Sequence, residues 1–172
     1  MVKISFKQNN KVYFNRLAVK VLIIAVLIGL DILTKSLAQQ HLAGGDDATL
    51  ISGVLSLKYA ENPGAAFGLF SQSIVMLIIL SSLFVIAFFA YDYFNHNKSL
   101  WYYASFTLII SGAVGNFIDR ISFGYVRDFI KLDFINFPIF NLADTFLTIG
   151  IIAYTIYIFI SLGKNKTVEN AQ

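Results

Sequence analysis

Four apolar runs, each long enough to cross a lipid bilayer, limit the folds open to this chain. About 20 residues of helix span roughly 30 Å of hydrocarbon. We expect spanning helices over residues 16–40, 73–94, 100–119 and 141–163. Only 13% of the 172 side chains are charged, whereas about a quarter of a soluble domain is charged. The sequence therefore predicts one integral membrane domain over residues 1–163 and a tail over 164–172.

Basic residues near the ends of these runs indicate how the helices cross. One side carries eight of them: Lys3, Lys7, Lys11, Arg16, Lys20, Lys98, Lys164 and Lys166. The other side carries four: Lys58, Arg120, Arg127 and Lys131. Because basic residues favour the cytoplasmic side, we expect both termini in the cytoplasm and loops 41–72 and 120–140 outside. The N-terminal run contains Asp31 and Lys35 and lacks a small-residue cleavage site, so we expect it to be retained rather than removed as a leader.

The two outer loops carry different patterns. In "LSLKYA", residues 55–60, the side chains alternate as in a half-buried strand. "ENPG" after it is typical of a turn. We therefore expect a small outer sheet over about 48–70. In the second loop, "DFIKLDFINFPIF" is too short to span, and we expect a short amphipathic piece at the membrane interface.

Several kinds of chemistry lack their residues. The chain has no Cys and only two His, which removes thiolate sites and any histidine-based metal site without carboxylate help. The basic residues are spread over ends and loops, so no nucleic-acid surface is indicated. We expect no metal and no cofactor. A Ser-His-Asp triad has no candidate, and a pair of Lys35 with Ser36 is disfavoured because neighbouring residues point apart on a helix.

Ionisable residues inside the runs need an explanation, since each costs about 2.5–3.5 kcal/mol at a helix centre. Asp31 and Lys35 are four residues apart and are predicted to pair on one helix face. Asn116, Asp119 and Arg120 close the third run. They could form a structural clamp to the outer loop or belong to a site, and the residues alone leave both interpretations open.

Two aspartates near the same outer boundary indicate a reaction. Asp144 in the first turn of the fourth helix, after Asn141 as N-cap, is favoured by the helix dipole alone. Asp128 alone could pair with Arg127 or Lys131. If the two carboxyls converge, they cannot both ionise, and one acid and one base would flank a water. That arrangement hydrolyses amides.

Two other functions would use the same residues. A small transporter or channel subunit would use the acids to relay protons or bind cations. A non-catalytic membrane scaffold would use them only to cap and clamp. In the scaffold, replacing either aspartate would lower stability rather than an activity.

Five segments resemble one family, lipoprotein signal peptidase, the bacterial type II signal peptidase. They are "DILTK", "ENPGAAFG", "SGAVGNFIDR", "VRDFI" and "FNLADTFLTIG". They occur in the family's order from the first run to the fourth. The resemblance implies four transmembrane helices, a small extracytoplasmic β-cradle and a short interfacial helix.

The resemblance also implies an intramembrane aspartyl endopeptidase of the bacterial cytoplasmic (inner) membrane, acting at its outer face. It would remove the signal peptide from prolipoproteins by cutting before a diacylglyceryl-modified Cys. By motif position, Asp128 and Asp144 would be the catalytic pair. Substrate-binding and supporting roles would fall to seven residues: Asn62, Asn116, Arg120, Asn141, Asp31, Lys35 and Asp119. Partners would be diacylated prolipoproteins and membrane lipid, and the chain would be a monomer.

Two positions depart from the family pattern. Ile32 stands where Gln is frequent, and Glu61 stands where an Arg commonly precedes the loop Asn. An acid in place of a base could alter the substrate's charge preference. The small residues of "NPGAAFG" suit pairing with an extended peptide, so bulky residues at Ala65 or Ala66 are expected to slow cleavage.

Overall fold

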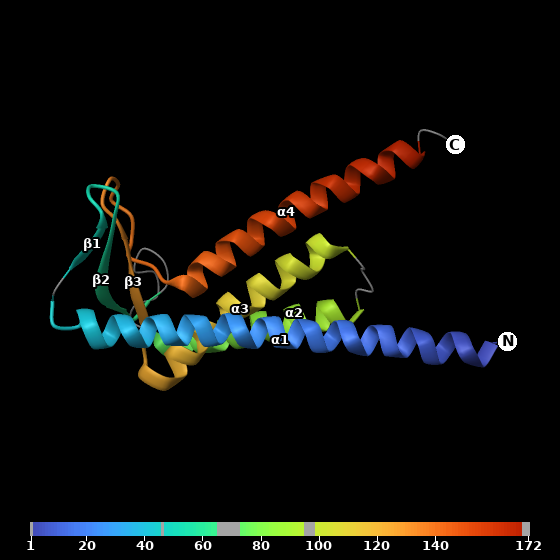
Figure 1. Cartoon of the computed structure of the whole chain (residues 1–172), viewed down its shortest axis with the longest axis horizontal. Coiled ribbons are helices and arrows are strands. Elements are labelled where there is room, and N and C mark those ends of the chain that lie inside the picture. The colour runs from blue at the N-terminus through green and yellow to red at the C-terminus, as the bar shows by residue number, and fades with distance from the viewer. Residues whose placement is uncertain (1, 46, 65–72, 95–98, 170–172) are drawn as a thin grey trace.

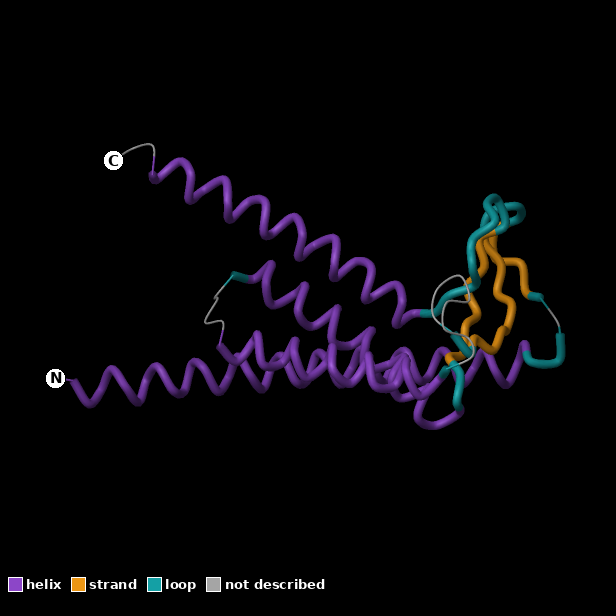
Figure 2. Tube along the Cα trace, turned by 180° about the vertical axis from the view of Figure 1, so that it is seen from behind, coloured by secondary structure: helices purple, strands orange, loops and turns teal. Residues whose placement is uncertain are grey.

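The computed structural model shows four long helices with a small sheet at one end (Figure 1). It describes residues 2–45, 47–64, 73–94 and 99–169, and the side chains of residues 17–162 within those ranges. The helices are α1 (Val2–Leu42), α2 (Ile74–Phe94), α3 (Leu100–Phe123) and α4 (Leu142–Glu169). The strands are β1 (Ala48–Ile51), β2 (Leu55–Asn62) and β3 (Val126–Leu132). Both ends of the chain lie on the side of the bundle away from the sheet (Figures 1 and 2).

Each helix contains a segment long and apolar enough to cross a membrane, which confirms the four predicted transmembrane helices. These segments are Leu17–Leu42, Ile74–Phe94, Leu100–Phe123 and Leu142–Leu162. In α3, 50% of the most apolar window is buried inside the protein, against 6–11% in the other three. The third helix is therefore the centre of the bundle, and most side chains of the other three are left to lipid.

Close packing of α3 against α4 depends on two glycines. A Cβ at Gly112 would meet the backbone of Ala143 and Leu147, and one at Gly150 would meet Ile109. Further along α3, Tyr102, Phe106 and Ile110 form a buried core cluster. These contacts fix α4 against α3 along its length.

A tight turn joins α3 to the sheet. Gly124, with φ of 79°, follows the last residue of α3 and donates its N–H to the Arg120 carbonyl. Only two residues separate the end of α3 from the start of β3. The polar end of α3 and the first residues of β3 are therefore held side by side.

The sheet is antiparallel, with strand order β1-β2-β3. Ala60 pairs with Asp128 and Asn62 with Val126 across β2 and β3, with an irregularity between Leu57 and Ala60. The predicted small sheet is thus confirmed. Residues 65–70 of the expected outer region, including Ala65 and Ala66, lie outside the described residues.

The second outer loop differs from the expectation of a short amphipathic piece. Its residues Val126–Leu132 form β3, a turn follows, and Phe140 returns to bridge Ile130. The parts of the chain that the structure describes contain no short interfacial helix. Pairing with β2 satisfies the polar backbone of this segment, so the segment has no need of helix. At the other end, α4 continues to Glu169, beyond the expected end at residue 163.

Candidate active site

Polar side chains from four elements converge where the helices meet the sheet. Asn62 ends β2, Asn116 lies near the end of α3, Asp128 lies on β3, Asn141 precedes α4, and Asp144 is in the first turn of α4. We call these five residues the dyad cluster. The fold alone brings them together, because they come from distant parts of the chain.

Asp128 is a buried carboxyl held by two amides. Its side chain is only 2% exposed. Asn62 donates its Nδ2 to Asp128 Oδ2 at 3.0 Å, and Asn141 donates its Nδ2 to Asp128 Oδ1 at 2.6 Å. Burial, and then the charge of Asp144, raise the pKa of Asp128 to about 7. A proton is therefore available in this cluster near neutral pH.

Asp144 is both a helix cap and a neighbour of Asp128. Its Oδ2 accepts the Asn141 backbone N–H at 3.2 Å, while its own N–H donates to Asn141 Oδ1 at 2.9 Å. This reciprocal arrangement satisfies two orphan donors at the start of α4, and it confirms the predicted N-cap at Asn141. The other oxygen of Asp144 accepts Asn116 Nδ2 at 2.7 Å. One carboxyl thus starts the helix and also belongs to the polar cluster.

Two asparagines connect the carboxyls. Asn141 Nδ2 donates to Asn116 Oδ1 at 3.0 Å as well as to Asp128. Asn116 Oδ1 also accepts Lys35 Nζ at 2.9 Å. Because the acceptor end of Asn116 faces Lys35 and Asn141, its donor end is left to face Asp144. The amide directions are thus set by Lys35, which lies outside the dyad cluster.

A second set of charges lies behind the dyad cluster, and we call Asp31, Lys35, Asp119 and Arg127 the support cluster. Lys35 Nζ lies 2.8 Å from Asp31 Oδ2 and 3.5 Å from Asp119 Oδ2, and these three side chains are fully buried. The predicted pair of Asp31 with Lys35 is confirmed. Asp31 also accepts the Ala143 N–H at 2.9 Å, so it fixes the first turn of α4.

Arg127 holds β3 to α3, which sequence reasoning missed. Its side chain donates to both oxygens of Asp119, at 2.8 and 3.2 Å, and its backbone N–H donates to Asp119 at 3.0 Å. The sequence offered Arg127 as a possible partner of Asp128, but the structure pairs Arg127 with Asp119. Arg127 approaches Asp119 across the turn at Gly124. That geometry places Asp128, the next residue, in the dyad cluster.

Arg120 and both aspartates line one cavity of about 440 Å³. The polar part of its wall also includes Asn62, Asn116, Thr145 and Thr148. The apolar part is formed by Val126, Leu132, Phe137, Pro138, Ile139, Phe140, Leu147 and Ile149. Arg120 donates to the Gly64 carbonyl at a long 3.4 Å. Its Nε is buried and has no hydrogen-bond partner within the described residues. The cavity therefore combines two carboxyls, an incompletely satisfied cation and a large apolar wall.

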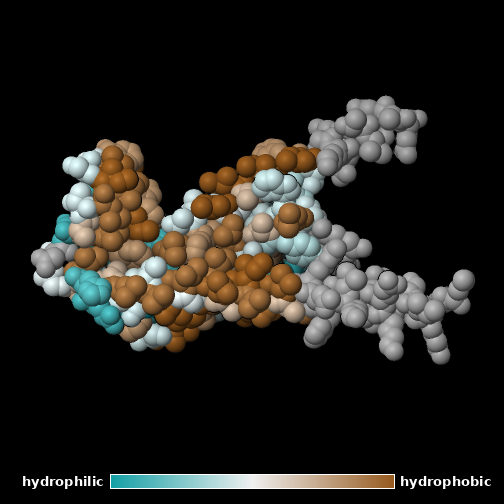
Figure 3. All heavy atoms as spheres, viewed as in Figure 1, coloured by the Kyte–Doolittle hydropathy of each residue, from teal (hydrophilic) through white to brown (hydrophobic). Residues whose placement is uncertain are grey.

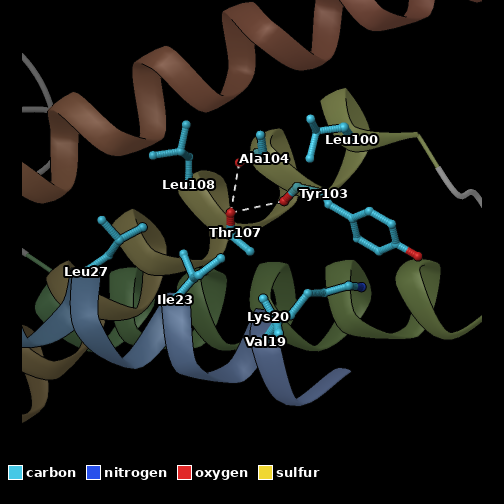
Figure 4. Close-up of a pocket in the computed structure, with 9 residues that line it drawn as sticks. All are labelled: Val19, Lys20, Ile23, Leu27, Leu100, Tyr103, Ala104, Thr107 and Leu108. Atoms are coloured by element: carbon cyan, nitrogen blue, oxygen red, sulfur yellow. Dashed lines mark hydrogen bonds between the residues drawn. The ribbon is translucent and has the colours of Figure 1, made fainter. Parts of the chain in front are cut away.

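A larger cavity, of about 570 Å³, lies elsewhere in the bundle and has a different character. It is lined by α1 and α3, and Figure 4 shows mainly apolar side chains around it. The Thr107 hydroxyl is turned back to the Tyr103 and Ala104 carbonyls. Lys20 donates to both oxygens of Asp92 at 2.7 Å, and Tyr102 donates to Asp92 at 3.0 Å. The Lys20 ammonium and the Thr107 hydroxyl are thus engaged, and no carboxyl of the residues that the structure describes lines this cavity.

Comparisons with known proteins agree with the geometry. The sequence profile of the family described as Signal peptidase (SPase) II matches residues 23–160. The lipoprotein signal peptidase of Enterococcus faecalis is 38% identical over 156 residues, which covers 88% of this chain and 97% of that protein. The lipoprotein signal peptidase of Streptococcus thermophilus is 44% identical over 137 residues, covering 80% and 89%.

Solved structures agree as well. A bacterial membrane enzyme determined by the in meso method at 2.3 Å resolution gives a TM-score of 0.79 at 30% identity, over 86% of this chain and 91% of that one. A second, at 1.9 Å resolution, gives 0.75 at 32% identity, over 82% and 92%. With its four spanning helices, its sheet and a sequence that matches the family over most of its length, this chain belongs to the signal peptidase II family.

Proposed function

We propose that this chain removes signal peptides from prolipoproteins, with Asp128 and Asp144 as the two catalytic carboxyls. The observation that carries the proposal is their convergence: both line one cavity, and Asn116 and Asn141 connect them by hydrogen bonds. The raised pKa of Asp128 supports a dyad that keeps one proton at neutral pH. The curated relatives named lipoprotein signal peptidase supply the substrate class.

The reaction needs only water and the dyad. The ionised carboxyl takes a proton from water as the water oxygen bonds to the scissile carbonyl carbon. The protonated carboxyl gives its proton to the carbonyl oxygen, and a neutral tetrahedral intermediate forms. The carbon–nitrogen bond then breaks as the leaving nitrogen receives a proton from the dyad. One product ends in a new carboxyl group, and the other begins with a new amino group.

Seven further residues have proposed roles around the reaction. Asn62, Asn116 and Asn141 orient the two carboxyls and occupy their remaining acceptor positions. Arg120, with its unsatisfied Nε in the cavity wall, would hold a backbone carbonyl of the substrate. Asp31, Lys35 and Asp119 keep these groups in place from behind.

The substrate is proposed to carry diacylglycerol on the Cys after the cleaved bond. The apolar wall of the cavity, including Leu132 and Phe137 to Phe140, supports this because acyl chains can stay in lipid while the amide reaches the carboxyls. The enzyme is a multi-pass protein of the bacterial cytoplasmic (inner) membrane. We propose that the dyad faces outward, since both termini lie at the far end and basic residues dominate there. We also propose that the chain acts as a monomer.

The test is cleavage of a diacylated prolipoprotein by the purified chain in detergent. The expected products are the free signal peptide and a protein that begins with the lipid-modified Cys, both identified by mass. Asp128→Asn and Asp144→Asn should be inactive although folded. If the chain moves protons or cations while leaving the prolipoprotein intact, the transporter is correct. If either variant merely unfolds, the scaffold is correct.

A further inference from the structure

The sheet ends in two turns that expose large apolar side chains. At the end of β1 and in the turn that leads to β2, Leu50, Ile51 and Val54 are 57%, 55% and 43% exposed. In the turn after β3, Phe134 and Ile135 are 60% and 47% exposed. We call these five residues the sheet tip. They lie outside the four spanning segments, so lipid contact by those helices does not explain them.

The two turns form one surface. Asp133 donates its backbone N–H to the Val54 carbonyl at 3.0 Å, which joins the second turn to the first. Ser56 donates to Asp133 Oδ1 at 2.9 Å. The nearby charges Lys131 and Asp133 pair with each other at 3.0 Å. The five apolar side chains therefore project from a joined edge whose closest charges compensate each other.

The sheet runs crosswise to the helices. In Figure 1 the strands stand across the direction of α1, and the turns extend away from it, past the start of α4. Figure 3 shows brown spheres over much of this projecting part, facing the side from which the helices leave. Because the helices cross the bilayer, a sheet lying across them at one end extends over the membrane plane rather than into water.

We propose that the sheet tip inserts into the leaflet on the dyad's side and contacts its lipid chains. Contiguous exposed apolar patches mark interaction surfaces, and this patch continues the lipid-facing surface of the bundle. Amphipathic elements bury their apolar face about 5–10 Å into the boundary between headgroups and chains. Insertion also fixes one wall of the dyad's cavity, because the segment from Phe137 to Phe140 follows the tip directly and lines that cavity.

Fluorescence of a single tryptophan tests the insertion. The chain has one Trp, Trp101, and no Cys. Trp101→Phe therefore gives a protein without tryptophan fluorescence, and any Cys introduced later is the only one in the chain. Phe134→Trp on this background reports from the tip. Lys58→Trp is the matched control, because Lys58 lies on the same sheet, is exposed and pairs with Asp47 at 3.1 Å. Both full-length variants are placed in phosphatidylcholine–phosphatidylglycerol nanodiscs with and without brominated acyl chains.

The tip tryptophan is expected to emit at shorter wavelength and to be quenched by brominated chains at least twofold more than the control. The control is expected to respond to aqueous iodide. Equal responses at both positions, or iodide quenching at the tip, would overturn the insertion. None of these readouts depends on cleavage, so their failure is separate from failure of the peptidase.

A second copy of the chain could instead cover the tip. Nanodiscs loaded with one chain each distinguish the two occupants. Bromine quenching that persists with one chain per disc supports lipid. Protection that occurs only with two chains per disc, together with disulfide-linked dimers of Phe134→Cys, would overturn the proposal in favour of a dimer.

Discussion

Two buried ionic clusters lie in the same lipid-facing bundle, and they differ in what surrounds them. At the sheet end, the support and dyad clusters share amides and adjoin a cavity with a polar wall. At the other end, Lys20, Asp92 and Tyr102 form a closed group, with Lys20 also 4.8 and 4.7 Å from the Tyr103 and Phe106 ring centres. In both clusters, pairing of opposite charges offsets the free-energy cost of placing charged side chains inside a membrane. Only the first leaves a cation and two acids facing space that a substrate can fill.

The difference teaches that an intramembrane charge is not by itself a site. The Lys20 group ties α1 to α2 and α3, and each of its polar atoms is engaged. In the dyad cluster, asparagines hold the carboxyls in place while leaving them at the cavity wall. A test of the comparison is therefore whether changes at one end affect chemistry and changes at the other affect only stability.

The largest expected effect comes from the dyad. Asp128→Asn or Asp144→Asn should lower kcat/KM for a diacylated prolipoprotein by about 10²–10⁴-fold or more, since each removes an acid–base group. The control variant, Asp92→Asn at the other end of the bundle, should cleave the prolipoprotein at the wild-type rate. The rates are measured in detergent alongside the thermal unfolding of each variant. Equal losses for all three would show that buried acids at both ends matter for the same reason.

The next largest difference between the two ends is expected in the stability lost when a buried cation is removed. Lys35→Met leaves Asp31 and Asp119 without their shared partner, which costs about 3–5 kcal/mol for a buried pair. Lys20→Met should cost less, about 0.6–1.7 kcal/mol, which spans the average to the maximum for polar contacts between membrane helices, because the Lys20 and Asp92 side chains remain 11% and 16% exposed. Unfolding in mixed micelles by titration with a denaturing detergent measures both. The reverse ranking would contradict the central place given to Lys35.

Helix contact at the sheet end gives a smaller effect. Gly112→Val should destabilise the protein by about 1–3 kcal/mol, because the added carbons meet the backbone of α4. Gly29→Val is the control, since a Cβ at Gly29 has nothing within 4 Å. The same unfolding titration compares the two variants. A stable Gly112→Val would mean that α3 and α4 can separate without harm.

The smallest effect is the dependence on pH. Because the pKa of Asp128 is raised to about 7, kcat/KM should fall about tenfold per pH unit once the dyad loses its proton above that value. The raised pKa also means that the folded protein binds this proton more tightly than the unfolded chain does. The contribution of Asp128 to stability should thus decline as pH rises from 3.8 to about 7 and stay constant above. Asp128→Asn should remove that decline.

The sequence predicted the features that rest on local pattern. Length and hydropathy gave the four helices, and alternation over residues 55–60 gave the strand β2. The spacing of Asp31 and Lys35 gave their pair, and Asn141 before an apolar run gave the cap of α4. The convergence of Asp128 and Asp144 was a hypothesis from their shared boundary, and their catalytic roles stay predictions.

Features that depend on long-range pairing could not be predicted in the same way. Val126–Leu132 has no alternation of buried and exposed side chains, since its first four residues are all buried, so the local pattern predicts a short interfacial piece rather than a strand. Only its register against β2 makes it a strand. Arg127 and Asp119 meet because Gly124 reverses the chain. The sequence indicated only a topology signal at Lys20, because Asp92, the acid that Lys20 pairs with, lies 72 positions away in the chain.

Some side chains that line the cavity also hold the two carboxyls in place. This limits which substitutions could make the enzyme resistant to an inhibitor. A compound filling the 440 Å³ cavity would touch Asn62, Asn116, Arg120 and both carboxyls. Asn62 and Asn116 hold the aspartates directly, so a substitution there that weakens the drug also misplaces the two carboxyls that we propose to react. Resistance would have to arise in the apolar wall, where a drug that takes its affinity from the polar side has least to lose.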